Sequence, residues 1–281
     1  MSGPLLNIEL ARRIELAEAQ AAVEGAETLR RLRPGSGAAV ESIAGGFAVY
    51  CGRNSPITQA VGMGLAGPVS EEEFDRLEEF YRSHNEPVRV ETCPLADPSF
   101  IEHFGKRRYR VTEFSNVMAF PLDAARGMRS WPGPPAGMTM EKIGNEQIDL
   151  WTLTVAQGFA EHFPVTQEIL EVMKMFALGP SAECYLARID GKVAGGATLA
   201  IRNGVAGLFG ASTLPAFRNR GVQTALLYAR LSRAAAADCD LAVSLALPGS
   251  TSQRNIVRQG FMVLYTRVKF EREFEAGNPA Q

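Results

Sequence analysis

A strand, a glycine turn and a helix follow one another in the second half of the chain, and this arrangement constrains the fold more than any other feature. The apolar run "GLFGAST" predicts the strand, and the helix-periodic run "VQTALLYARLSRAAAA" predicts the helix. Gly221 stands at the start of that helix, with Arg218 and Arg220 just before it. The N-terminus of a helix carries the positive end of the macrodipole, so two cations there are unfavourable by themselves. An anion bound between them would remove the repulsion, and this turn is therefore suited to an anion.

The turn at Gly221 has the parts of a phosphate cradle. The first N–H groups of a helix have no partner inside the helix, and a glycine lets the backbone approach a ligand closely. Arg218 and Arg220 add charge that suits phosphate oxygens. A simple loop glycine with two solvated arginines fits this short stretch equally well, so both interpretations stand at this point.

Length and charge exclude several classes of protein. A chain of 281 residues is long enough for one large domain or two ordinary ones, and its 46% apolar content is typical of a globular protein. A net charge of −2 provides no basic surface, so no nucleic-acid partner is expected. Because there is no signal-peptide pattern and no apolar run of membrane-spanning length, we expect a cytoplasmic protein without a membrane partner.

The cysteines and histidines do not form a metal-binding pattern. Four cysteines lie far apart, at Cys51, Cys93, Cys184 and Cys239, and the chain has only three histidines. No C-x-x-C pair occurs among them. We therefore expect no metal, and we expect reduced thiols with a structural role.

Periodicity and turn residues predict most of the remaining elements. Leu5–Arg33 predicts a long helix, and the Pro- and Gly-rich run "DAARGMRSWPGPPAGM" predicts an interdomain linker. Next come a strand at "TMEKIG", helices at "NEQIDLWTLTVAQGFAE" and "TQEILEVMKMFAL", and three strands, two of them joined by an Asp-Gly hairpin at "DGK". In the helix after Gly221, Val222, Leu226 and Ala229 are expected to form the buried stripe. The final run "FMVLYTRVKFER" predicts a pair of strands.

The order of elements in the first half recurs in the second, which indicates a duplicated α/β unit. Each copy runs from a helix to a strand that ends at a proline, then through a short helix and an aromatic residue to an extended run. The landmarks are the helix Glu71–His84, Pro94 and Tyr109 in the first half, and the helix from Val222, Pro248 and Phe261 in the second. Sequence identity between the halves is faint, so a chance similarity of element order is the alternative.

The first-half helix begins differently from the helix at Gly221. Ser70 and Glu73 form a capping-box pattern, and Glu71, Glu72 and Glu73 fill the first turn. These carboxylates occupy the positive end of the helix dipole and would repel phosphate. The contrast predicts one anion site per chain.

The stretch "PAFRNRGVQTALL" resembles the acyl-CoA pyrophosphate loop of the GNAT superfamily of N-acetyltransferases. That family's pattern is Arg/Gln-x-x-Gly-x-Gly/Ala, represented here by Arg218, Gly221 and Gln223, with glutamine at the last position. The later run "STSQRNIVRQGFMV" resembles a second element of the family. The resemblance covers about Met138 to Arg272, and the first half resembles a degenerate GNAT domain that lacks the loop.

The resemblance implies an α/β (α+β) fold with two GNAT-like domains, each a mixed, mostly antiparallel sheet flanked by helices. The expected domains are residues 1–123, which would be degenerate, and residues 139–281, joined by a linker at 124–138. The first domain would serve a structural role or form one wall of the acceptor site.

The resemblance also implies transfer of the acetyl group of acetyl-CoA to a primary amine of a small molecule or peptide, by direct attack. A backbone N–H on the strand before the loop would polarise the thioester carbonyl. The oligomeric state does not follow from the sequence. The residues expected to bind the CoA portion are Thr213, Leu214, Arg218, Asn219, Arg220, Gly221, Val222, Gln223, Thr224 and Asn255.

The proton-transfer groups are less well marked. Many relatives carry a tyrosine four residues before the Gly-Phe pair to protonate the CoA thiolate, and here that position is Ile256. Ser252 and Tyr265 are the candidate substitutes, although a helix cap is the simpler role for Ser252. The candidate general bases are ordinary surface groups in the simpler interpretation: Asp149, Glu161, His162 and Glu183.

Two other functions fit the same motifs. The loop contacts only the CoA end, so transfer of a larger acyl group is one alternative. A non-catalytic CoA-binding or sensor protein is the other, because the usual tyrosine is missing. Trp151, Phe159, Phe163 and Phe176 lie on helices that shape the acceptor pocket in related proteins, and for these side chains core packing is favoured over recognition.

Overall fold

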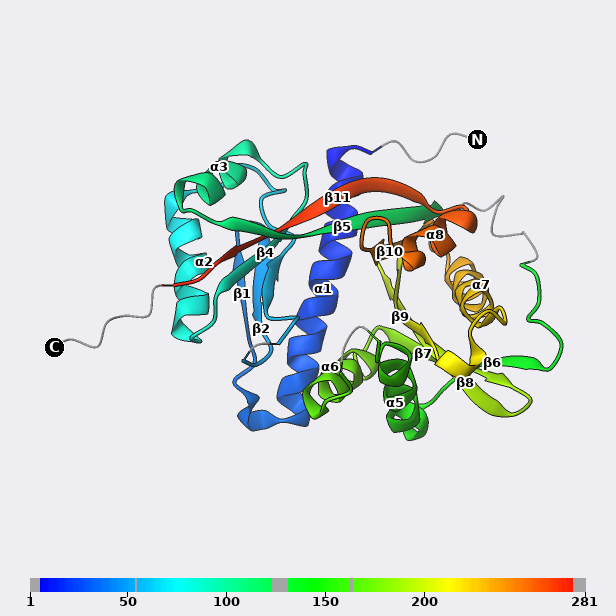
Figure 1. Ribbon diagram of the computed structural model, residues 1–281. Helices are drawn as coiled ribbons and strands as arrows, with labels where there is room; N and C mark the ends of the chain where they lie inside the picture. The colour runs from blue at the N-terminus through cyan, green and yellow to red at the C-terminus, as the bar shows by residue number, and fades with distance from the viewer. Residues whose placement is uncertain (1–5, 54, 123–130, 162–163, 275–281) are drawn as a thin grey trace. The chain divides into compact units, whose positions relative to one another are not determined.

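The computed structural model describes residues 6–53, 55–122, 131–161 and 164–274. Within this part of the chain, the fold is mixed α/β, with mostly antiparallel strands flanked by helices (Figure 1). This is the fold class that the sequence predicts.

The chain forms two compact units that do not follow the expected boundaries. One unit contains Leu6–Asn116 together with the chain from Tyr265 onward, and the other contains Val117–Leu264. Strands β5 (Arg110–Pro121) and β11 (Met262–Arg272) therefore each contribute to both units. Strand β11 contributes to both units because its C-terminal end pairs antiparallel with β4. The last strand of the sequence therefore extends the sheet of the N-terminal unit. Local periodicity carries no signal for such a distant partner.

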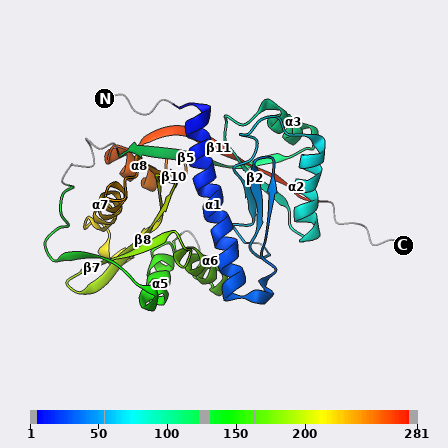
Figure 2. The same cartoon turned by 180° about the vertical axis from the view of Figure 1, so that it is seen from behind.

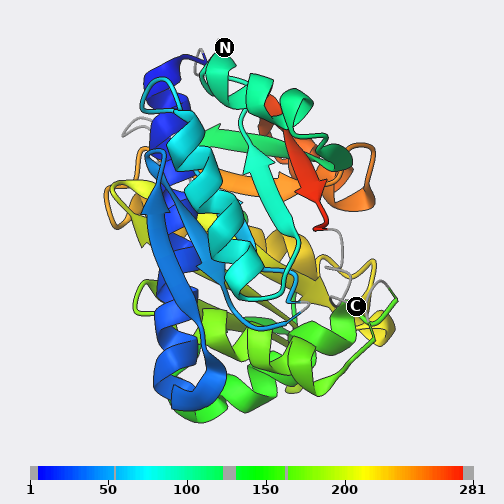
Figure 3. The same ribbon diagram turned by 90° about the vertical axis from the view of Figure 1, so that its left-hand side faces the viewer.

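In the N-terminal unit the strands follow the order β1-β2-β3-β4-β11-β5. The long helix α1 lies on one face of β1 and β2 and α2 lies on the other (Figures 1 and 3). Apart from β5 and β11, the helices and strands of the N-terminal unit are, in chain order, α1 (Ile8–Leu32), η1 (Pro34–Ser36), β1 (Ala39–Ile43), β2 (Gly46–Tyr50), β3 (Gln59–Val61), α2 (Glu71–Ser83), β4 (Val88–Thr92) and α3 (Pro98–Lys106).

Aromatic side chains fill the core of the N-terminal unit. The ring of Phe74, on α2, packs against Phe100 and Phe104 of α3 with ring centroids 5.8 and 5.5 Å apart, and against Tyr109 at 5.7 Å. Phe104 stacks on Phe270 of β11 at 4.1 Å. These contacts fix α2 and α3 against the sheet, because aromatic pairs add to the free energy of burial.

In the C-terminal unit the strands follow the order β5-β10-β9-β8-β7-β6. Only β9 and β10 are parallel among the pairs whose register is defined there. Helix α7 covers one face of β7 to β9, and α5 and α6 cover the other (Figure 2). Apart from β5 and β11, the helices and strands of the C-terminal unit are, in chain order, β6 (Met138–Lys142), η2 (Asn145–Gln147), α5 (Ile148–Gly158), α6 (Gln167–Ala177), β7 (Ala182–Ile189), β8 (Lys192–Arg202), β9 (Val205–Thr213), η3 (Pro215–Phe217), α7 (Val222–Ala235), β10 (Leu241–Ala246) and α8 (Thr251–Arg258).

The repeated order of elements is confirmed. The series α2, β4, α3, β5 in the first half matches α7, β10, α8, β11 in the second. The predicted Asp190–Gly191 hairpin joins β7 and β8, with both residues at positive φ. The final run is one strand, β11, and not the expected pair, because "MVLYTRVKFER" contains no glycine, proline, asparagine or aspartate to turn the chain.

The described part of the predicted linker packs against the C-terminal unit. Trp131 stacks on Tyr228 of α7, with ring centroids 5.1 Å apart, and contacts Phe120 at 5.7 Å. The linker ends at residue 137, since β6 begins at Met138. Residues 123–130 lie outside the described part of the chain.

Candidate functional site

The parallel strands β9 and β10 separate at the end that faces α7 and α8. Their pairing runs from Val205 to Leu208 on β9 and ends where Leu208 meets Ser244, whereas β9 continues to Thr213. The Ser244 hydroxyl donates to the Leu208 carbonyl at 3.1 Å and satisfies the last backbone acceptor before the strands part. The remaining edge of β9 can therefore receive an extended ligand by strand-like hydrogen bonding.

A β-bulge interrupts β9 just beyond this point. Gly196 of β8 pairs with Ser212 and Thr198 pairs with Phe209, so Gly210 and Ala211 both stand opposite a single residue. Gly210 has φ of +59°, a conformation that suits glycine. A bulge leaves its extra residue out of the ladder and re-aims the backbone. It therefore provides a backbone N–H on the strand where the sequence analysis expects the polarising group.

Helix α7 begins at Gly221, which has φ of +81°. The N–H of Ala225 is bonded to the Gly221 carbonyl at 3.0 Å, so the N–H groups of Val222, Gln223 and Thr224 lie at the free end of the helix. No side chain in the described part of the chain caps this end, whereas side chains cap α1, α2, α3, α6 and α8. The turn thus has the uncapped geometry that an anion can complete.

The two arginines before Gly221 differ in their surroundings. Arg218 donates to the Glu161 carboxylate at 2.6 Å and to the Gly158 carbonyl at 3.4 Å, so it ties the loop to the end of α5. Arg220 is exposed and lies over the Phe217 ring, 5.7 Å from its centroid. Arg220 is therefore the better placed of the two cations to meet a phosphate.

A hydrogen bond between two side-chain amides joins the start of α7 to α8. The Asn255 side chain, on α8, donates to the Gln223 side chain, on α7, at 2.8 Å. Asn219 has φ of +60°, a left-handed conformation that asparagine tolerates well. Gln223 therefore fits where the family pattern has glycine or alanine, because its side chain is turned toward α8 and its backbone N–H stays at the helix end.

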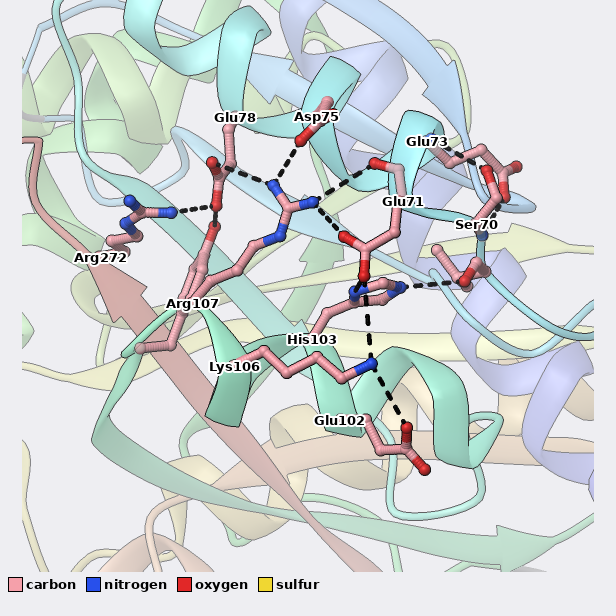
Figure 4. Close-up of polar contacts among 12 residues, drawn as sticks. Ser70, Glu71, Glu73, Asp75, Glu78, Glu102, His103, Lys106, Arg107 and Arg272 are labelled. Carbon is pink, nitrogen blue, oxygen red and sulfur yellow. Dashed lines mark hydrogen bonds and ion pairs between the residues drawn. The ribbon is translucent and has the colours of Figure 1, made fainter.

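The comparable helix start in the N-terminal unit is closed. The Ser70 hydroxyl accepts from the Glu73 N–H at 3.2 Å, and the Glu73 carboxylate accepts from the Ser70 N–H at 3.0 Å, which confirms the capping box. Figure 4 shows that Arg107 reaches back from α3 to Glu71 and Asp75, each at 2.5 Å. The hydrogen bond from Arg107 lowers the pKa of the Glu71 carboxyl, so this helix start carries negative charge at neutral pH.

Neutralising these acids is expected to leave acyl-CoA affinity unchanged. Glu71→Gln and Glu72→Gln together remove two charges but keep the Ser70–Glu73 capping box that closes the helix. The check is the dissociation constant for acetyl-CoA in the variant and the wild type. A large loss of affinity would place the ligand in the N-terminal unit.

The two candidate acids occupy different environments. Ser252 is exposed in the first turn of α8, where Ser250 and not Ser252 is the helix cap. Tyr265 is buried in the N-terminal unit, and its hydroxyl donates to the Glu15 carboxylate at 2.6 Å. Burial and the Glu15 charge raise the pKa of Tyr265 well above its usual range, which suits a structural hydroxyl. Ile256, at the position of the family's tyrosine, is buried in the core of the C-terminal unit.

The candidate bases that the structure describes are held in ion pairs. Asp149 accepts from Lys174 at 2.6 Å, and Glu161 pairs with Arg218. Partial burial acts to raise the pKa of Glu183, but hydrogen bonds from Arg233 and Lys142 hold it below its ordinary value. These pairs favour the interpretation as ordinary surface groups. His162 lies outside the described residues, as does Phe163.

The aromatic residues of α5 and α6 contribute mainly to packing. Trp151 is buried, and its indole N–H donates to the Ala197 carbonyl at 3.3 Å, opposite the bulge. Phe159 packs on the same core. Phe176 meets Phe209 of β9 edge-on with centroids 5.8 Å apart, immediately before the bulge. Phe176 and Phe209 therefore form an apolar surface on the α6 side of the site.

The sequence analysis missed three residues of this region. Gly210 and Ala211 form the bulge. The sequence signal for it was Gly210 itself, because an isolated glycine inside a predicted strand indicates a bulge. Arg230 lies on the buried face of α7, where the expected stripe had Ala229, which is only half-buried. Its signal was the spacing of four residues from Val222 through Leu226 to Arg230.

The described residues contain neither a metal-binding cluster nor a helix suited to span a bilayer. In that part of the chain, no three His, Cys, Asp or Glu side chains are grouped so as to hold a metal ion. None of the helices described is long and apolar enough to span a bilayer. All four cysteines are buried and lie outside any disulfide, and burial raises the pKa of Cys184 to about 12, so this thiol stays protonated at neutral pH.

Solved structures show that the fold is that of the GCN5-related N-acetyltransferases in a tandem arrangement. A GCN5-related N-acetyltransferase from Kribbella flavida has a TM-score of 0.65 at 15% identity, covering 92% of this chain and 96% of that chain. A tandem GNAT protein from the clavulanic acid biosynthesis pathway has a TM-score of 0.57 at 15% identity, covering 84% and 75% respectively. No curated protein matches the chain.

The family follows from the sequence of the C-terminal half. Residues 148–261 match the model of the Acetyltransferase (GNAT) family. The match over these residues indicates an acyltransferase of the GNAT family in this part of the chain. The matched residues include α5, α6, the separating strands and the Gly221 turn, so the match and the site geometry concern the same region.

Proposed function

We propose that the chain is an N-acetyltransferase that transfers the acetyl group of acetyl-CoA to a primary amine of a small molecule or peptide. The observation that carries this proposal is the uncapped start of α7 at Gly221, next to the edge of β9 that β10 leaves unpaired. The residues fit an acyl-CoA because the helix end can hold a pyrophosphate and the strand edge can hold an amide-containing arm.

Each part of the site has a distinct task. The N–H groups of Val222, Gln223 and Thr224, with Arg220 beside them, would bind the pyrophosphate, and Arg218 and Asn255 would hold the loop in shape. Thr213 and Leu214 would receive the pantetheine arm along β9. Acetyl-CoA supplies an acetyl group activated as a thioester.

The bulge on β9 would direct the acyl transfer. The amine nitrogen attacks the thioester carbonyl carbon, the C–S bond breaks, the nitrogen gives up one proton as it becomes an amide, and the CoA thiolate takes up a proton. A backbone N–H at Gly210 or Ala211 would stabilise the negative charge that develops on the carbonyl oxygen. Ser252 remains the candidate proton donor, because its hydroxyl is exposed at the start of α8, whereas Tyr265 is bonded to Glu15.

A thermal-shift screen with acetyl-CoA, CoA and longer acyl-CoAs tests this proposal. We expect acetyl-CoA to raise the melting temperature, since a ligand that binds only the folded state stabilises it by about 2.7 kcal/mol at 100 times its dissociation constant. An amine panel with thiol release as the readout then identifies turnover. No shift with any CoA species at saturation would refute the proposal. A shift without turnover would favour the sensor, and turnover only with longer chains would favour a larger acyl group.

A further inference from the structure

Arg230 is a charged side chain in the middle of the apolar face of α7. It is 3% exposed, and it lies among Leu226, Leu227, Leu231 and Ala234, which belong to the core of the C-terminal unit. A buried charge is costly unless its environment compensates it. Its hydrogen-bond partners therefore indicate what the residue does.

The guanidinium of Arg230 donates only to backbone carbonyls within the described residues. Its Nε donates to the Leu226 carbonyl at 3.1 Å, and its Nη1 donates to Thr198 at 2.9 Å and to Phe209 at 3.5 Å. In contrast, Arg233 on the same helix is paired with the Glu183 carboxylate at 2.8 Å. Burial lowers the pKa of Arg230 to about 10, so it still carries its charge at neutral pH.

The carbonyls of Thr198 and Phe209 flank the bulge. These two residues face one another across β8 and β9 at the register position that precedes Gly210 and Ala211. A Cβ atom on Gly210 would lie 3.3 Å from the Thr198 hydroxyl, so the backbone is closely confined there. Arg230 thus bridges both strands at the point where the ladder is broken.

The Phe209 carbonyl belongs to the same peptide group as the Gly210 N–H. A hydrogen bond to the oxygen of a peptide group polarises its N–H, which then becomes a stronger donor. A cationic donor gives a stronger effect than a neutral one. The contact from Arg230 therefore acts on one of the N–H groups that the bulge provides.

We propose that Arg230 is a positioning residue for acyl transfer, which holds the bulge and strengthens the Gly210 N–H as a donor to the thioester carbonyl. This inference rests on the proposed function, because it requires an acyl-CoA on β9. It assigns no contact between Arg230 and the ligand. A purely structural arginine would support the fold without affecting the carbonyl.

Infrared spectroscopy of bound [1-13C]acetyl-CoA tests the inference without a known acceptor. In the wild type, we expect the labelled carbonyl stretch to move to lower frequency on binding. Arg230→Met should lose most of that shift while the dissociation constant for acetyl-CoA stays the same. Arg233→Met is the matched control on the same helix, and it should keep the full shift. Arg230→Lys should give an intermediate shift, because a lysine cannot bridge two carbonyls with a rigid fork.

The outcomes separate this inference from the proposed function. If wild-type protein does not bind acetyl-CoA, the proposed function fails. If it binds but the carbonyl does not shift, or if Arg230→Met keeps the wild-type shift, the inference is overturned and the proposed function stands. Should Arg230→Met fail to fold, a full shift in Arg230→Lys would overturn the inference.

Discussion

Replacing Gly221 with glutamate is expected to abolish the rise in melting temperature that we predict for acetyl-CoA. The substitution places a carboxylate where the first N–H groups of α7 would receive the pyrophosphate, and its negative charge competes for the same helix end. We expect a loss of affinity of at least about 100-fold, equivalent to about 2.7 kcal/mol. The measurements are the thermal shift and the dissociation constant for acetyl-CoA.

The Gly221→Glu protein should remain folded. Among the described residues, a Cβ atom at this position would meet Pro135 alone, at an ordinary 3.4 Å, and Gly221 itself is exposed. The positive φ costs about 1 kcal/mol for a side chain, which an acid at the helix N-terminus partly offsets. Gly221→Gln is the matched control, because it has the same size and backbone strain without the charge. A normal acetyl-CoA response in Gly221→Glu would contradict the assignment of the loop.

Replacing Arg267 with methionine is expected to destabilise the N-terminal unit by about 3–5 kcal/mol, because it leaves buried carboxylates without their cation. Arg267 is 2% exposed and lies on β11. Its guanidinium contacts Glu15 and Glu18 of α1, each at 2.7 Å, and Glu91 of β4 at 3.4 Å. Urea-induced unfolding, followed by circular dichroism, gives the change in the free energy of unfolding.

The destabilisation by Arg267→Met should depend on pH. Burial raises the pKa of the Glu18 carboxyl and the charge of Arg267 opposes that rise, so the loss of Arg267 raises this pKa further above that in the unfolded state. A group with a raised folded pKa stabilises the fold at low pH, and that contribution is lost as the pH rises through the folded pKa. The deficit is therefore smaller at pH 5 than at pH 7. Arg110→Met, which removes an exposed cation from its ion pairs with Glu271 and Glu273, should change stability little. A pH-independent deficit would mean that Glu18 is not the group left uncompensated.

Much of the fold could be predicted because its signals are local. The capping box at Ser70, the Asp-Gly hairpin and the glycine at the start of α7 each depend on a few neighbouring residues. The apolar periodicity of α7 and the order of elements in both halves are also local patterns. These signals suffice to predict the class of fold and the position of the uncapped helix start at Gly221.

The features that were missed depend on partners far away in the sequence. Nothing near Val268 indicates that it pairs with Thr92, and nothing near Arg218 indicates an ion pair with Glu161. The register that creates the bulge at Gly210 involves both β8 and β9. The role of Arg230 follows only from the carbonyls that this bulge places beside it. Such partners are chosen by packing, which a periodic pattern does not encode.

Isothermal titration calorimetry with acetyl-CoA tests the central claim most directly, because it counts the sites. The Gly221 turn is uncapped, whereas the start of α2 is closed by Ser70 and Glu73 and carries Glu71 and Glu72 in its first turn. The account predicts one acetyl-CoA bound per wild-type chain and none in Gly221→Glu. Two sites per wild-type chain, or one that persists in Gly221→Glu, would contradict it.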